Sequence, residues 1–198
     1  METSPLFARV APFAIFLVLT FCPGQFGEAS RYWFYLAKTV VGAWLIWEMR
    51  HAVLEMRWAF SWEAVVVGVG VCVIWVGLDE FYPKFGSAGT PWNPHLQFGD
   101  GSGLAWLFIA VRILGSSLVV PPLEEVFYLS FLYRYIAKTD FMAVPLGCFA
   151  WVPFLVTAAV FGFVHHEWLA GILCAMAYQG LVIRSEEHTS ELQSRQVI

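Results

Sequence analysis

The sequence predicts an all-α fold, namely a polytopic helical membrane protein with about six transmembrane helices. Of its 198 residues, 59% are apolar and only 13% are charged, whereas a soluble domain has roughly 25% charged residues. The mean hydropathy is +0.66, and ten Trp and eighteen Phe enlarge the apolar area. Several apolar stretches approach the roughly 20 residues that a helix needs to cross the hydrocarbon of a bilayer. We therefore expect lipid as a partner of this chain.

Five apolar stretches each predict one helix that crosses the membrane. They are residues 10–22, 32–47, 62–78, 141–163 and 168–183. Arg9 and Lys38 stand near the ends of the first two stretches, and their long side chains can carry the charge to the interface. The net charge of −4 and the lack of a basic cluster argue against a nucleic-acid partner.

Residues 103–138 are too long for one simple span, and they contain Arg112 and the pair Pro121-Pro122. Cytoplasmic loops carry an excess of Lys and Arg. The residues that set the orientation are Arg9, Arg50, Arg57, Arg134 and Lys138. We therefore expect an interfacial or re-entrant lead-in over residues 103–115 and a fourth crossing over residues 116–134, kinked at its prolines.

This orientation places both ends of the chain inside and the loop of residues 81–101 outside. Pro, Gly and Asn in that loop predict turns. Cys22, Cys72, Cys148 and Cys174 occur singly in or beside apolar runs, which predicts small buried hydrophobic residues rather than a disulfide framework or a zinc site.

The sequence changes character at Arg184 and is polar from there on. The stretch resembles the in-frame translation of a sequencing adapter. We therefore expect a helical membrane domain over residues 1–183, a non-native tail over residues 184–198, and native C-terminal sequence beyond Ile183 that is missing here. A genuine polar cytoplasmic tail is the alternative.

The pair Glu124 and Glu125 follows Pro121-Pro122 within one of the most apolar parts of the chain. Ionisable residues at membrane depth are costly and indicate a functional site. Two adjacent carboxylates in a medium of low dielectric favour protonation of one of them, which suits proton transfer. The alternative is a helix cap at the membrane surface, where the first turn favours acids.

A second polar group of residues, His165-His166-Glu167, lies at the junction of the last two predicted spans. Phe161 stands four residues before His165 and completes the pattern F-x-x-x-H. The alternative is an interfacial turn whose polar groups are simply solvated. A metal held by Glu124, Glu125, His165 and Glu167 is a further alternative, although the chain has no H-E-x-x-H motif.

The Glu-Glu pair followed by F-x-x-x-H resembles the CPBP family of intramembrane glutamic endopeptidases, the family of the type II CAAX prenyl endopeptidases. The resemblance covers about residues 104–183 and is strongest to the bacterial branch found beside exosortase sorting systems. It implies that Glu124 and His165 activate a water for attack on a peptide carbonyl, with Glu125 as the supporting carboxylate. It implies no cofactor and no metal.

The resemblance also implies the setting of the protein. We expect a multi-pass protein of the bacterial inner membrane, a membrane-anchored protein or peptide substrate, and an exosortase-type sorting system as partner.

Two departures from the family pattern matter. Leu129 occupies the arginine position of E-E-x-x-x-R, and no histidine is followed by Asn or Asp in the spacing of the family's oxyanion motif, H-x-x-x-N or H-x-x-x-D. Oxyanion donors are worth about 3 kcal/mol each, so we expect this fragment to be inactive or nearly so. A non-catalytic relative, acting as a binding, immunity or protein-sorting partner, is the alternative.

Overall fold

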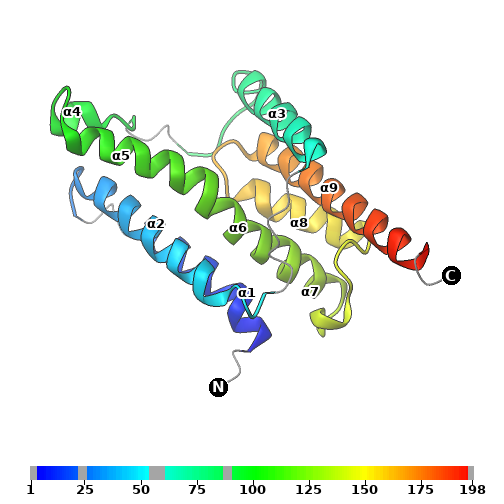
Figure 1. Ribbon diagram of the computed structural model, residues 1–198. Coiled ribbons are helices and arrows are strands. Elements are labelled where there is room, and N and C mark those ends of the chain that lie inside the picture. Colours follow the sequence, from blue (N-terminus) through cyan, green and yellow to red (C-terminus); the bar gives the residue numbers. More distant parts are fainter. Residues whose placement is uncertain (1–3, 22–25, 54–60, 87–90, 196–198) are drawn as a thin grey trace. The chain divides into compact units, whose positions relative to one another are not determined.

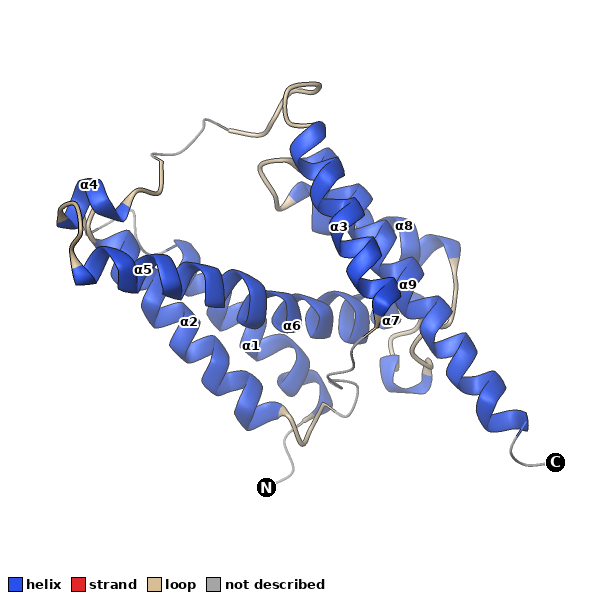
Figure 2. Cartoon of the chain, turned by 45° about the horizontal axis from the view of Figure 1, so that its top comes forward, coloured by secondary structure: helices blue, strands red, loops and turns tan. Residues whose placement is uncertain are grey.

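The computed structural model describes residues 4–21, 26–53, 61–86 and 91–195, with side chains as far as Glu186. The described residues form helices joined by turns, and no strand occurs among them (Figure 2). The predicted all-α class is therefore confirmed. The chain divides into two units.

Unit 1 comprises Met1–Arg57 and Gly89–Phe127. Its helices are α1 (Pro5–Phe21), α2 (Ser30–Met49), α4 (Pro94–Phe98), α5 (Gly103–Leu114) and α6 (Val120–Glu125). Helices α1 and α2 pack along each other, and α6 packs against both (Figure 1). The loop before α5 holds turns and the short helix α4, which begins because the Asn93 side chain accepts hydrogen bonds from the first free backbone N–H groups.

The core of unit 1 lies where α6 meets the first two helices. Val126, directly after α6, is buried with Ala8 and Val53. Gly42 on α2 allows a close approach of the backbone, because a Cβ atom there would lie 2.7 Å from Val119 Cγ1 and 3.2 Å from Leu123 Cδ1. These contacts fix which face of α6 is turned inward.

Unit 2 comprises Trp58–Ala88 and Tyr128–Ile198. Its helices are α3 (Trp62–Gly77), α7 (Arg134–Ala137), α8 (Trp151–Phe163) and α9 (Trp168–Arg195). Helices α8 and α9 lie side by side, and α3 packs on α9 (Figures 1 and 2). Gly162 on α8 and Gly171 on α9 make the contact between these two helices possible, since their backbones approach closely near the α8–α9 turn.

One continuous helix runs from Gly103 to Ala137, which corrects the predicted break into a lead-in and a crossing. The helix absorbs Pro121 and Pro122 through the wider π-helical turn Gly115–Val119, where the Val120 N–H donates to the Gly115 carbonyl five residues back. Proline lacks an N–H and its ring clashes with the preceding turn, and a π-turn rearranges the backbone hydrogen bonds at that point. A second π-helical stretch covers Val126–Tyr133.

The predicted helix over residues 141–163 is wrong in its first half. Only Trp151–Phe163 forms α8, and residues before it make the short 3₁₀ turn Phe141–Ala143 and a loop. The buried Arg134 accounts for the difference, because its guanidinium donates to the carbonyls of Met142 and Val144. Those carbonyls are thereby held in a turn rather than in a helix.

The remaining predicted helices are present as α1, α2, α3 and α9. Helix α9 extends beyond the predicted end at Ile183 to Arg195, since the polar stretch contains helix-compatible Glu, Leu and Gln and no Gly or Pro. The division into residues 1–183 and 184–198 therefore stays a prediction. Cys22 and Arg57 lie outside the described residues. Cys174 is buried as expected, but Cys72 and Cys148 are exposed.

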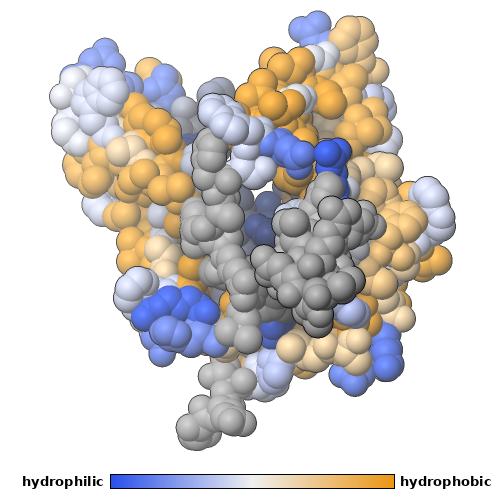
Figure 3. Space-filling model, turned by 45° about the vertical axis from the view of Figure 1, so that its right-hand side comes forward, coloured by the Kyte–Doolittle hydropathy of each residue, from blue (hydrophilic) through white to orange (hydrophobic). Residues whose placement is uncertain are grey.

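Within the described residues, two helices are long and apolar enough to cross a membrane, Gly103–Ala137 and Trp168–Glu186. Three shorter apolar helices accompany them, Pro5–Phe21, Trp62–Gly77 and Trp151–Phe163. The predicted count of six spans is thus not supported by helix length. Much of the surface in view is nevertheless apolar (Figure 3), and large hydrophobic side chains are exposed along many of the helices.

Candidate functional site

The carboxylate pair lies inside the continuous helix, at the end of α6. Leu123 and Val126 on either side of it are buried in unit 1. Successive residues of a helix are turned by about 100°, so Glu124 and Glu125 point away from the face that packs against α1 and α2. Glu124 is half-buried and Glu125 is exposed.

The alternative of a helix cap does not describe this position. Gly103 is about 30 Å before Glu124 at about 1.5 Å per residue, and the helix continues past Glu125 to Ala137. The backbone N–H groups near the pair are therefore already used by the helix. A surface cap requires a free helix end, and there is none here.

Neither carboxylate has a hydrogen bond or ion pair with a group in the described part of the chain. Arg112, considered from the sequence as a substitute cation, lies instead over the rings of Tyr35 and Trp92, with distances of 5.1 Å and 4.6 Å from Cζ to the ring centroids. Leu129, at the position of the family arginine, lines a small cavity of unit 2. Within the described residues, the pair therefore has no neutralising cation of the kind found in the family pattern.

His165 lies just beyond the C-terminal end of α8. Its Nδ1 is 2.6 Å from the Phe161 carbonyl oxygen, and its ring packs on Phe161 and edge-on to Trp75, with centroid distances of 4.6 Å and 5.8 Å. A carbonyl only accepts hydrogen bonds, so Nδ1 must carry the proton of the neutral ring. Nε2 is then left as the acceptor, which is the form that can hold a water or take a proton.

The spacing F-x-x-x-H thus has a local structural cause. The last carbonyls of a helix have no partner within the helix, and the His165 side chain satisfies that of Phe161. Tyr128 packs edge-on against the Phe161 ring at 5.0 Å. The Phe161 ring and carbonyl together orient the His165 imidazole.

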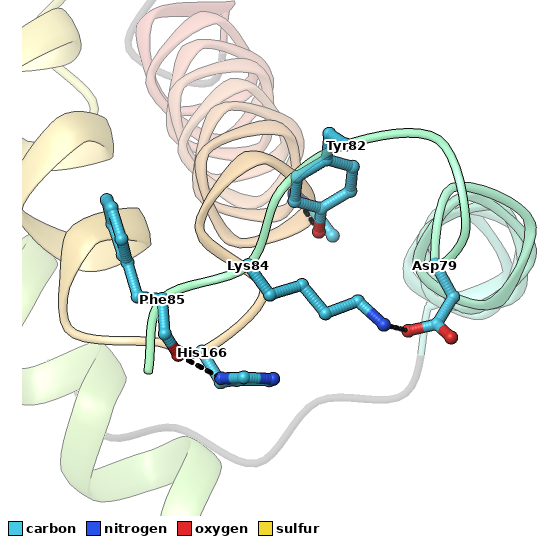
Figure 4. Close-up of polar contacts among 6 residues, drawn as sticks. Asp79, Tyr82, Lys84, Phe85 and His166 are labelled. Carbon is cyan, nitrogen blue, oxygen red and sulfur yellow. Dashed lines mark hydrogen bonds and ion pairs between the residues drawn. The ribbon is translucent and has the colours of Figure 1, made fainter. Parts of the chain in front are cut away.

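His166 and Glu167 contact a segment that the sequence placed in an outer loop. This segment, residues 79–86, lies across the α8–α9 turn (Figure 4). Phe85 N–H donates to the His166 carbonyl at 3.0 Å, and the Phe85 carbonyl accepts a hydrogen bond from His166 Nδ1. Trp168 Nε1 donates to the Pro83 carbonyl at 2.8 Å. The polar side chains of this turn are therefore bound to protein groups, not simply solvated.

Three ionisable side chains, those of Asp79, Lys84 and Glu167, complete this contact. The Lys84 ammonium donates to the Asp79 carboxylate, and this hydrogen bond, followed by one with Glu167, lowers the pKa of Asp79. Partial burial, followed by the hydrogen bond and charge of Asp79, raises the pKa of Glu167. The hydrogen bond to Asp79 also raises the pKa of Lys84. A protonated Glu167 can therefore donate to an ionised Asp79.

The structure brings together only part of the predicted site. Phe161 and His165 are in contact, and His166 and Glu167 engage the segment of residues 79–86. Glu124 and Glu125 belong to unit 1, whereas His165 belongs to unit 2, so their combination stays a prediction. Among the described residues, no group of three or more His, Cys, Asp or Glu side chains is arranged to hold a metal ion.

The sequence did not identify the residues that contact the His165 turn from a distant segment, nor the buried amide of Gln179. Trp75, Asp79 and Lys84 could not be assigned to the His165 turn, because they lie more than eighty residues from it in the chain. Gln179 had a sequence indication that was not used, since an uncharged polar side chain interrupts an apolar span there. Its amide is buried in unit 2.

The fold and the site define an all-helical protein with extensive exposed apolar surface and a carboxylate pair inside an apolar helix. Comparison of the chain with protein-family models, with curated proteins and with solved structures finds no match. The function is therefore inferred from the residues themselves.

Proposed function

We propose that the chain is a multi-pass protein of the bacterial inner membrane. The observation that supports a membrane setting is α3, a helix of Val, Gly and other apolar residues in which no residue is buried. Val66, Val69 and Val73 are 60–69% exposed. Contiguous apolar surface of this kind requires a membrane or a partner to cover it, and lipid would cover the sides of α3 that do not pack on α9. The bacterial inner membrane is taken from the family resemblance alone.

The proposed topology has six crossings, with both ends of the chain inside. The shorter helices α1, α3 and α8 cross with the help of flanking residues, because a bilayer thins around short spans and tolerates modest mismatch. Arg112 lies about 18 Å before Glu124 along the helix, and Arg134 lies about 14 Å after Glu125, at about 1.5 Å per residue. Both acids then lie near the middle of a hydrocarbon layer about 30 Å thick.

We further propose that the intact parent of this chain is an intramembrane, glutamate-dependent endopeptidase. The single observation that carries the proposal is the position of Glu124 and Glu125 within an uninterrupted apolar helix of 35 residues. Carboxylates at membrane depth are retained where function requires them. The resemblance of the Glu-Glu and F-x-x-x-H patterns to the glutamic endopeptidases supplies the reaction type.

In the proposed reaction, the Glu124 carboxylate takes a proton from a water as the water oxygen bonds to the peptide carbonyl carbon. The carbonyl π electrons move to oxygen, and the tetrahedral intermediate collapses by breaking the C–N bond. Glu124 returns its proton to the departing amine, so the products are a carboxyl and an amino terminus. His165 Nε2 accepts a hydrogen bond from the water, and Glu125 supports its neighbour.

The test is Glu124→Gln in a complete parent that continues into an oxyanion motif. The amide keeps the size of the side chain but cannot accept the proton, so cleavage should fall by about 100-fold or more. New membrane-proximal protein termini in cells that express the parent provide the readout, measured by mass spectrometry. Glu80→Gln, in the exposed loop after α3, is the matched control and should leave cleavage unchanged. Full cleavage by the Glu124→Gln variant would refute the catalytic role.

The second candidate is a non-catalytic membrane protein that binds a partner in an immunity or protein-sorting system. Leu129 favours this function, because no cation stands where the family has arginine. A binding protein should tolerate Glu124→Gln without loss of its partner. The same variant therefore distinguishes the two candidates when partner capture is measured beside cleavage.

A further inference from the structure

A small cavity lies within unit 2, between the end of the long helix, the loop before α8 and helix α9. Its volume is about 20 Å³. One ordered water needs roughly 10–15 Å³ on this measure, so the cavity can hold a single water molecule but no organic ligand. Its walls are largely apolar and include Leu129, Pro145, Val182 and Ile183.

Gln179 on α9 gives the cavity its polar character. The residue is 2% exposed, and neither Nε2 nor Oε1 has a hydrogen-bond partner among the described protein groups. Buried side-chain amides are almost always hydrogen-bonded to protein or to an ordered water. This amide therefore needs a partner that can both accept from Nε2 and donate to Oε1.

The other polar side chains of the cavity wall are already engaged. The Tyr133 hydroxyl accepts from Ala150 N–H at 2.9 Å and donates to the Cys148 carbonyl at 3.0 Å. Arg134 Nε donates to the Val144 carbonyl at 2.7 Å. These bonds hold the loop in place.

The charge of Arg134 and the amide together restrict the ligand. A cation would be repelled by the Arg134 guanidinium and would leave Nε2 without an acceptor, whereas an anion would leave Oε1 without a donor. Water alone among small species satisfies both ends of the amide and fits the volume. We propose that the cavity binds one ordered water, which accepts a hydrogen bond from Nε2 of Gln179 and donates one to Oε1.

The direct test is an experimental structure of the chain in detergent or lipid, at a resolution that shows ordered water. The expected result is one water peak about 2.7–3.2 Å from both Nε2 and Oε1 of Gln179. The proposal is overturned if the cavity contains no density, or if the amide bonds directly to a protein group.

A pair of substitutions tests the same site in solution. Leu129→Phe should fill the cavity and expel the water, which lowers Tm because the amide is left unpaired. Gln179→Leu should change Tm little, because amide and water depart together. In the Gln179→Leu background, Leu129→Phe should then lower Tm much less. Leu132→Phe, on the same helix but outside the cavity wall, is the control and should act equally in both backgrounds.

Two outcomes of this cycle contradict the proposal. Equal Tm losses for Leu129→Phe in both backgrounds would mean that the substitution disturbs packing alone. A marked rise in Tm for Gln179→Leu would mean that the amide is unpaired in the native protein. The Tm of Gln179→Leu does not depend on the bulkier Leu129→Phe substitution, so it remains decisive if the Leu129→Phe variant does not fold.

Discussion

Basic side chains within the apolar segments, unlike Glu124 and Glu125, have partners among the described residues of the protein. Lys38 was expected to reach the membrane interface, but its ammonium donates to Thr20 Oγ1 at 3.2 Å and lies over the rings of Phe16 and Tyr35. A hydroxyl and two aromatic faces stabilise the ammonium where it stands. Lys38 thereby joins α1 to α2.

Arg134 is buried and binds backbone carbonyls of the loop before α8, so its removal should destabilise unit 2. We expect Arg134→Met to lower the free energy of unfolding by about 2–3 kcal/mol, because the buried carbonyls lose a charged donor. Denaturant unfolding in detergent micelles provides the measurement. Lys138→Met, at an exposed position just after the same helix, is the control and should change stability by less than about 0.5 kcal/mol. Equal effects of the two substitutions would contradict the role assigned to Arg134.

The Asp79–Glu167 contact should make the attachment of residues 79–86 depend on pH. The pKa of Asp79 is lowered, so its contribution is present above its ordinary value of 3.8 and is lost as the pH falls through the folded value. The pKa of Glu167 is raised, so its contribution is present below its ordinary value of 4.5 and is lost as the pH rises through the folded value. The attachment of residues 79–86 is therefore strongest between pH 3.8 and pH 4.5, where both contributions are fully present.

Hydrogen exchange at the Phe85 amide measures this attachment, because that N–H donates to the His166 carbonyl. After correction for intrinsic exchange, its protection should fall as Glu167 ionises. Glu167→Gln should remove this loss of protection, since the amide donates at every pH. Glu80→Gln should leave the wild-type profile intact. A profile that is the same for wild type and Glu167→Gln would show that another group titrates.

At the scale of elements, the contact between α8 and α9 depends on glycine. A Cβ atom on Gly162 would lie 2.6 Å from the Trp168 carbonyl oxygen and 2.8 Å from the Ile172 nitrogen. Both atoms belong to the backbone, so neither can move aside without shifting the helix. The turn that carries His165 is held by the same approach.

Gly162→Ala should therefore cost about 3 kcal/mol through overpacking. Gly70→Ala on α3 is the matched control, because a Cβ atom there meets no atom within 4 Å. That control should stabilise the helix by about 0.5–1 kcal/mol. Thermal unfolding of both variants in the same detergent measures the difference. A Gly162→Ala variant as stable as the control would mean that α8 and α9 do not approach as described.

For the whole molecule, the proposed membrane setting is tested by two exposed cysteines. Cys72 lies on the apolar helix α3, and Cys148 lies in the loop before α8. In single-cysteine variants, Cys72 should react with a lipid-soluble maleimide but not with a charged one. Cys148 should react with the charged reagent from the cytoplasmic side of inverted membranes. Rapid labelling of Cys72 by the charged reagent in intact membranes would contradict the crossing of α3.

Helices that depend on local apolar runs were predictable from the sequence, whereas features that depend on contacts between more distant residues were not. The apolar stretches of residues 32–47 and 62–78 predicted α2 and α3 closely, because hydrophobic runs of that length favour helices wherever they occur. The stretch of residues 10–22 located α1, although that helix begins earlier, at Pro5. The double proline was expected to kink the helix, and in the structure a π-helical turn just before it accommodates the two prolines. The loop that replaces the first half of the predicted helix over residues 141–163 was missed, because it depends on hydrogen bonds from Arg134 to carbonyls eight and ten residues away.

In the candidate site, too, the local features were predictable from the sequence and the contacts between distant segments were not. The sequence located Glu124 and Glu125 in an apolar segment and paired His165 with Phe161, and these are local features. It gave no means of finding Trp75 or Asp79 beside the His165 turn, because those contacts join segments distant in the chain.

The sequence by itself determined the all-α class, the positions of most helices and the placement of two acids within an apolar segment. These follow from composition and from local hydrogen bonding, which each stretch of chain carries with it. Only the tertiary structure decided which partner each buried polar group has, where a helix gives way to a loop, and that Gln179 faces a cavity. Those outcomes depend on competition between distant groups for the same donors, acceptors and space, and that competition is settled only when the helices pack.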